Sequence, residues 1–207
     1  MEECIKTLNP IQTENTVVIC PPAELIGKFH NFRHHLGAQN CATANFGAFT
    51  GESSAAILHE LGCEYVIVGH SERRNLLGET NEIIFKKWNT ACENNLVPIL
   101  CVGEKENAEK TLTAQLEFFC SRNSKNTIIA YEPVWSIGTG VTPTMEKIDA
   151  TLRFIKKLVG RSSRLLYGGS VNRNNIGEIL QLPNIDGVLI GGASLNIPEF
   201  AKMVEGV

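Results

Sequence analysis

Short runs of apolar, β-branched residues alternate along the chain with longer segments in which apolar residues recur every three or four positions. The short runs predict strands at residues 17–20, 37–40, 65–69, 98–103, 127–132, 164–168 and 187–191. The longer segments predict helices near residues 23–35, 53–61, 79–94, 107–121, 144–159, 173–181 and 197–204. Strands and helices that alternate in this order predict an α/β protein built on a parallel sheet with right-handed crossovers.

Two architectures fit such a sheet, a doubly wound open sheet and a (β/α) barrel. Continuous apolar runs such as Val66-Ile67-Val68 predict strands that are buried on both faces, which either architecture requires. A doubly wound sheet concentrates its functional groups at one switch point, whereas a barrel places them at the ends of many strands. Polar or glycine-rich groups follow nearly every predicted strand here, so we favour a barrel and predict a single barrel domain over residues 1–207.

Composition and charge exclude several classes of partner. Of the 207 residues, 43% are hydrophobic and 20% are charged, which is typical of a soluble globular protein. The formal net charge of -3 argues against nucleic acid and against an anionic membrane surface. No apolar run approaches the ~20 residues of a membrane span, and the acidic start predicts no signal peptide. We therefore expect a cytoplasmic protein that has neither nucleic acid nor membrane as a partner.

The cysteines and histidines predict neither a disulfide framework nor a metal centre. The seven cysteines are scattered without a C-x-x-C pair, which suits a reducing compartment in which buried thiols act as small apolar groups. The histidines other than His70 fall on predicted helical segments without metal-ligand spacing, so we predict no metal.

One stretch combines an acidic residue with a loop rich in proline and glycine. Glu132 ends a predicted buried strand, and Pro133, Trp135, Gly138 and Gly140 follow it. A carboxylate at a strand exit, followed at once by such a loop, is how a catalytic base and a covering loop would be built together. The alternative is a surface glutamate before an ordinary loop, and this stretch alone does not decide between them.

His70 occupies a second strand exit. It precedes Ser71, Glu72, Arg73 and Arg74, and a position beside a helix start disfavours the charged imidazolium, so a neutral ring could donate a hydrogen bond to a substrate oxygen. The alternative is a histidine that bonds only to the backbone. We interpret Glu72 and Arg73 as charges that orient the site rather than as a solvated first helical turn, and both alternatives stay open for Arg74.

Glycines close the last two predicted strands. Gly168-Gly169-Ser170 and Gly191-Gly192 would let backbone amides approach a phosphate group closely. The alternative is that these glycines serve only tight turns. Two such pairs on consecutive late strands of a barrel are, however, typical of a phosphate site.

Taken together, these motifs resemble the triosephosphate isomerase family. The resemblance spans about residues 15–205 and rests on residues 17–22, 37–40, 47–52, 65–74, 131–140, 167–172 and 186–195. Ser136 stands where alanine is usual in the family. The length and order of these motifs make the match specific, and it implies a TIM barrel.

The resemblance also implies a reaction, the interconversion of glyceraldehyde 3-phosphate and dihydroxyacetone phosphate through an enediol(ate). Glu132 would be the base and His70 the electrophile, the pairing known for this family. The phosphate of this small phosphorylated triose would be held by Gly138, Ser170, Gly191 and Gly192. No cofactor is implied. Residues 41–52 would insert into a second copy to form a homodimer in which Thr50 reaches toward the partner's site.

The sequence departs from the family pattern at its start. The family carries an Asn-x-Lys at the exit of its first strand, whereas residues 1–16 here look like the end of the first helix and place Lys6 in it. With 207 residues instead of about 250, the chain predicts about seven strands of an eight-stranded barrel. We expect either that upstream sequence supplies the missing strand and lysine, or that the chain is a catalytically impaired, phosphate-binding descendant of the family.

Overall fold

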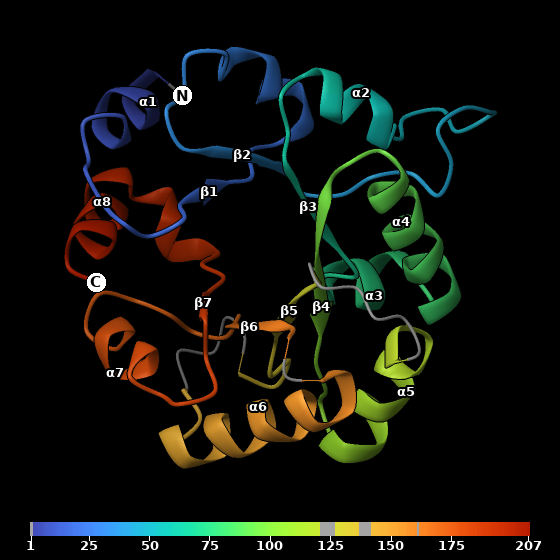
Figure 1. The fold of residues 1–207 in the computed structure, drawn as a ribbon, viewed down its shortest axis with the longest axis vertical. Helices are drawn as coiled ribbons and strands as arrows, with labels where there is room; N and C mark the ends of the chain where they lie inside the picture. The colour runs from blue at the N-terminus through green and yellow to red at the C-terminus, as the bar shows by residue number, and fades with distance from the viewer. Residues whose placement is uncertain (1, 121–126, 137–141, 161) are drawn as a thin grey trace. The chain divides into compact units, whose positions relative to one another are not determined.

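Parallel strands separated by helices make up the structure (Figure 1). This computed structural model describes residues 2–120, 127–136, 142–160 and 162–207. Seven strands occur in those residues, and every strand pair with a recorded register is parallel. The chain divides into two compact units, Met1–Leu100 and Cys101–Val207, which are described in turn. The predicted single domain therefore stays a prediction.

The first unit pairs its strands in sequence order. Val18 pairs with His35, Gly37 with Tyr65, and Tyr65 with Val97. The four residues of the strand that begins at Tyr65 are all buried, as a central parallel strand requires. The elements are α1 (Glu2–Leu8), β1 (Val18–Ile19), the 3-10 helix η1 (Ala23–Lys28), β2 (His35–Ala38), α2 (Ala55–Glu60), β3 (Tyr65–Val68), α3 (Ser71–Leu77), α4 (Asn81–Glu93) and β4 (Val97–Val102), whose last two residues belong to the second unit.

The prediction of a helix over residues 23–35 is wrong. Only Ala23–Lys28 is helical, as a 3-10 helix, and His35 already belongs to β2. The apolar residues of this segment do recur at helical spacing. The backbone N–H of His35, however, donates to the carbonyl of Val17 at 3.0 Å, and the ring Nε2 of His34 lies 2.9 Å from the carbonyl of Leu8. Strand pairing between distant residues thus outweighs the local helical pattern.

The second unit also orders its strands as the sequence does. Ile128 pairs with Arg164, and Leu166 pairs with Gly187. The elements are α5 (Ala108–Cys120), β5 (Ile128–Tyr131), α6 (Met145–Val159), β6 (Arg164–Tyr167), α7 (Ile176–Leu180), β7 (Gly187–Val188), the 3-10 helix η2 (Gly192–Leu195) and α8 (Ile197–Glu205).

Helix α6 follows its sequence pattern closely. Its apolar stripe, Ile148, Leu152 and Ile155, is fully buried, and α6 packs against α5 and β6 (Figure 1). The hydroxyl of Thr144 accepts a hydrogen bond from the backbone N–H of Lys147 at 3.3 Å, which caps the start of the helix. The predicted range, 144–159, differs from the observed helix only by this capping residue.

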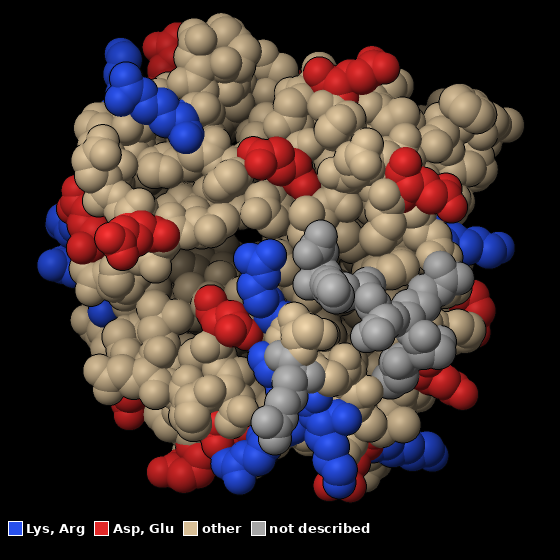
Figure 2. Space-filling model, viewed as in Figure 1, with Lys and Arg blue, Asp and Glu red and all other residues tan. Residues whose placement is uncertain are grey.

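Burial differs along the strands in a way that positions the site. All residues of β3 and β5 are buried, whereas the two residues of β1 and the two of β7 are only half-buried. Side chains that follow β3 and β5 therefore stand on well-packed supports. No helix in the described part of the chain is long and apolar enough to cross a membrane. On the face shown in Figure 2, acidic and basic side chains are interspersed among a majority of uncharged residues.

Candidate active site

His70 follows β3 and caps helix α3. Its ring Nδ1 accepts a hydrogen bond from the backbone N–H of Glu72 at 3.4 Å, and the ring is 28% exposed. A neutral imidazole that accepts at Nδ1 carries its proton on Nε2, which is then a donor. The carboxylate of Glu72 is largely exposed and lies 3.7 Å from Nδ1. Glu72 thus orients the ring chiefly through its backbone.

Arg74, whose role was left open in the sequence analysis, supports the turn between β3 and α3. Its Nε donates to the carbonyl of Gly69 at 2.8 Å, and its Nη1 donates to the side-chain oxygen of Asn81 at 2.8 Å. Gly69 has φ +72°, a left-handed conformation that side chains rarely adopt. Arg74 therefore ties the chain reversal before His70 to the start of α4.

A buried ion-pair network lies behind Arg73. Glu79 Oε1 accepts from Arg73 Nε at 2.6 Å and from Lys87 Nζ at 2.6 Å. Burial raises the pKa of Glu79, but the hydrogen bonds from Lys87 and Arg73 outweigh it and hold this pKa below its usual value. Arg73 is thus bonded to Glu79, a residue that sequence reasoning missed, and its orienting role stays a prediction.

The same network anchors the segment 41–52. Lys87 Nζ donates to the side-chain oxygen of Asn40 at 2.9 Å and lies 3.8 Å from Glu52 Oε2. The hydroxyl of Thr90 donates to the carbonyl of Thr43 at 2.9 Å. Both ends of the segment are therefore tied to α4. Its tip, which includes Thr50, is exposed.

Glu132 follows β5 and is 1% exposed. Its backbone N–H donates to the carbonyl of Val102 at 2.7 Å. A Cβ added to Gly103 would lie 1.7 Å from the carbonyl oxygen of Glu132, and one added to Gly168 would lie 3.1 Å from its Cγ. Two glycines therefore allow the neighbouring strand exits to close around this residue, which fixes both its backbone and its side chain.

Gln115 of α5 holds one of these glycines in place. Its side-chain oxygen accepts from the N–H of Gly103, and its side-chain amide donates to the carbonyl of Gly103, both at 2.9 Å. A buried side-chain amide thus satisfies both backbone groups at the end of β4. Sequence reasoning missed this residue, because nothing local distinguishes Gln115 from the other polar positions of α5.

A second buried acid, Glu104, bonds to residues on both sides of Glu132 in the sequence. Its Oε1 accepts from the hydroxyl of Tyr131 at 3.1 Å, and its backbone carbonyl accepts from the N–H of Val134 at 3.0 Å. Burial raises the pKa of Glu104, while hydrogen bonds from Tyr131 and Trp135 and the charge of Lys147 oppose the rise. Glu104 therefore supports the segment that follows Glu132, a role that the sequence did not reveal.

The glycine-rich exits of the last two strands differ in their surroundings. The hydroxyl of Ser170 donates to the carbonyl of Ser136 at 3.1 Å, which links the end of β6 to the segment after Glu132. A Cβ added to Gly191 or Gly192 would meet nothing within 4 Å, so packing inside the chain does not require glycine there. This openness leaves room for an approaching ligand. Gly138, the fourth predicted phosphate contact, lies outside the described residues.

Comparison with known proteins relates this sequence to a family. The sequence matches the family described as triosephosphate isomerase over residues 1–207. The chain belongs to the triosephosphate isomerase family.

Curated relatives named triosephosphate isomerase cover most of the chain. The protein from Rhodopirellula baltica is 42% identical over 91% of this chain and 83% of its own length. The protein from Picosynechococcus is 43% identical over 94% of this chain and 86% of its own length. The protein from Francisella philomiragia is 43% identical over 82% and 74% respectively. The resemblance and the fold class expected from the sequence are thereby confirmed.

Proposed function

We propose that this chain is a triosephosphate isomerase that interconverts D-glyceraldehyde 3-phosphate and dihydroxyacetone phosphate through an enediol(ate). Membership of the isomerase family supports the reaction. The observation that carries the proposal is the buried carboxylate of Glu132, which Gly103 and Gly168 confine at the exit of β5. A base held in one orientation saves most of the entropy that a freely moving base would lose in the reaction.

Glu132 removes the proton from the carbon next to the substrate carbonyl and returns it to the neighbouring carbon. The net change moves one proton between the two carbons and one between their two oxygens, with no oxidant or reductant consumed. Burial of the carboxylate supports this role because it keeps bulk water from competing for the proton. No cofactor takes part in the proposed reaction.

His70 polarises the carbonyl through Nε2–H. The hydrogen bond from the backbone N–H of Glu72 to Nδ1 supports this assignment, because it favours the tautomer with the proton on Nε2. A donor directed at an oxygen that gains negative charge in the transition state is typically the largest contribution to catalysis of this kind. Glu72 and Arg73 support His70 without touching the substrate.

Ser170, Gly191, Gly192 and Gly138 bind the phosphate group of the substrate. The open space at the two later glycines supports their part in this assignment. Backbone amides without side chains suit a phosphate, because its oxygens can approach them closely.

The chain acts as a cytoplasmic homodimer that associates through residues 41–52, with Thr50 directed toward the partner's site. Phe46 is 87% exposed and Phe49 is 42% exposed at the tip of this segment, which a second copy would cover. Neither nucleic acid nor a membrane is a partner, in line with the net charge of -3.

A coupled isomerase assay tests the proposal, with Glu132→Gln as the test variant and Glu109→Gln as its control. Glu109 is exposed on α5, so its substitution makes the same chemical change away from the site. We expect Glu132→Gln to lose roughly 10²–10⁴-fold in kcat, as for removal of a general base, and Glu109→Gln to match the unsubstituted chain.

A folded chain without turnover would overturn the proposed activity. Thermal unfolding with 2-phosphoglycolate, an analogue of the enediolate, then separates the two remaining cases. A raised Tm without turnover identifies the impaired phosphate-binding descendant, whereas an unchanged Tm excludes a triose phosphate site altogether.

A further inference from the structure

Lys147 of α6 contacts the ring of Trp135. Its Nζ lies 4.5 Å from the ring centroid, within the range of a cation–π interaction. Trp135 is half-buried, whereas Lys147 is the third residue of its helix and is exposed. The contact therefore joins an exposed helix residue to the segment that follows Glu132.

The position of Lys147 in its helix is unfavourable in itself. The first turn of a helix carries a partial positive charge, so a cation there is destabilising while an acid is stabilising. Thr144 caps α6 and Glu146 suits its first turn, but Lys147 does not. Helix stability thus gives no reason for a lysine at this position, whereas its contact with Trp135 does.

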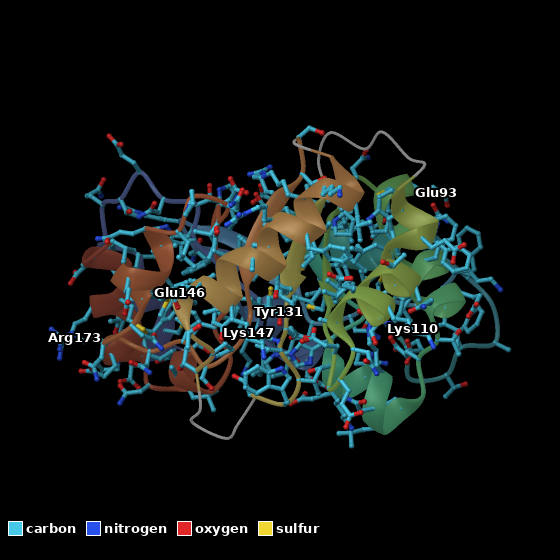
Figure 3. The ribbon with its side chains drawn as sticks, turned by 90° about the horizontal axis from the view of Figure 1, so that it is seen from below. Glu93, Lys110, Tyr131, Glu146, Lys147 and Arg173 are labelled. Carbon is cyan, nitrogen blue, oxygen red and sulfur yellow. The ribbon has the colours of Figure 1, made fainter. Side chains whose placement is uncertain are left out.

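Trp135 also interacts with the buried acid Glu104. Burial raises the pKa of this carboxyl group, and Trp135 and the charge of Lys147 oppose the rise. The hydroxyl of Tyr131 donates to the same group at 3.1 Å. Tyr131 belongs to β5 and Lys147 to α6, and both are labelled in Figure 3. The indole thus contacts an ammonium group from the helix and lies near a carboxyl group from the exit of β4.

Two further contacts of this segment are made by its backbone. The N–H of Val134 donates to the carbonyl of Glu104, and the carbonyl of Ser136 accepts from the hydroxyl of Ser170. These bonds fix the main chain but leave the torsions of the Trp135 side chain to its ring contacts. The side chain of Trp135, three residues after Glu132, is thereby positioned by its contact with Lys147 of α6.

We propose that Lys147 is a positioning residue, whose ammonium group holds the Trp135 ring near Glu104 and thereby fixes residues 132–136. This inference rests on the proposed function only in its last step, from the position of this segment to the rate of proton transfer.

The test compares Lys147→Gln with Lys147→Arg and Lys110→Gln. Arginine keeps a cation that stacks on an aromatic ring, so it should restore what glutamine removes. Lys110 is the third residue of α5, as Lys147 is of α6, and it is likewise exposed (Figure 3). No ring contact of Lys110 occurs within the described residues, so Lys110→Gln controls for loss of a cation in a first helical turn.

Two readouts are needed. The first is acrylamide quenching of Trp135 fluorescence in a Trp88→Phe background, since the chain has only two tryptophans. The second is kcat and KM. We expect Lys147→Gln to increase quenching and to lower kcat by about two- to fivefold with little change in KM. Lys147→Arg and Lys110→Gln should behave like the parent in both.

The outcomes distinguish this inference from the proposed function. Equal quenching in Lys147→Gln and Lys110→Gln would overturn it, even in a chain without isomerase activity. Increased quenching with unchanged kcat would overturn the claim that Lys147 positions Glu132 through Trp135. If Lys147→Gln raised Tm but changed neither readout, the lysine would be an ordinary surface residue.

Discussion

The side chain of Glu132 lies directly against Gly168, so closely that a Cβ on this glycine would come within 3.1 Å of Glu132 Cγ. The two residues end neighbouring strands, and the N–H of Gly168 donates to the carbonyl of Tyr131 at 2.8 Å. The pairing of these strands therefore places Gly168 next to the side chain of Glu132. The absence of a side chain at Gly168 therefore leaves space for Glu132.

Gly168→Ala should lower kcat without unfolding the chain. The new methyl group would displace Glu132 Cγ by a few tenths of an ångström, and misplacement of a base on this scale is expected to reduce kcat by about tenfold. Steady-state kinetics measures the effect. Gly177→Ala in α7 is the control, because its Cβ meets nothing within 4 Å. An unchanged kcat in Gly168→Ala would show that Glu132 tolerates the contact.

Lys87→Met should destabilise the first unit strongly. The substitution leaves Glu79 buried with Arg73 as its remaining cationic hydrogen-bond donor among the described contacts, and loss of one partner from a buried ion pair costs about 3 kcal/mol. Urea unfolding at pH 7 measures this loss. Lys86→Met, an exposed neighbour on α4, should lie within about 0.5 kcal/mol of the parent.

The same network determines whether the stability of the chain rises or falls with pH. Because the pKa of Glu79 is lower in the folded state, its stabilising contribution is present above the ordinary value of 4.5 and is lost as pH falls through the folded pKa. The difference between Lys87→Met and the parent should therefore shrink in acid. A difference independent of pH would mean that packing, rather than charge, accounts for the loss.

How far the sequence predicts this molecule depends on whether the interactions are local. Helix α6 follows from its apolar stripe and from the cap at Thr144, both contained in one short segment. The helix predicted over residues 23–35 is wrong because His35 pairs with Val18, seventeen residues earlier. His70 and Glu132 stand out because they end apolar strands. The residues that support this part of the structure, Glu79 and Gln115, do not stand out in the sequence, because their partners come near only when the chain folds.

Glu104 should make stability depend on pH in the opposite sense from Glu79, and Glu104→Gln should remove that dependence. Burial raises the pKa of Glu104, so its contribution to stability is complete below 4.5 and is lost as pH rises through the folded pKa. Glutamine keeps an oxygen for the Tyr131 hydroxyl but cannot ionise. We expect the variant to lose less stability than the parent between pH 4.5 and 7. Urea unfolding across this range measures it, with the exposed Glu109→Gln as control.

Phe46→Asp should weaken association of two copies without unfolding either one. Phe46 is 87% exposed at the tip of residues 41–52, while the ends of this segment are anchored through Lys87 and Thr90. A charge at the tip would be desolvated in an interface but solvated in a monomer, so it acts on association alone. Sedimentation velocity over a range of concentrations measures the equilibrium.

Phe46→Leu is the matched variant, because it keeps an apolar side chain at the tip. We expect it to associate nearly as well as the parent, while Phe46→Asp shifts the midpoint of association to at least tenfold higher concentration, equivalent to about 1.4 kcal/mol. Equal association of all three chains would place the interface elsewhere. Far-UV circular dichroism, unchanged among them, shows that the comparison is made between folded chains.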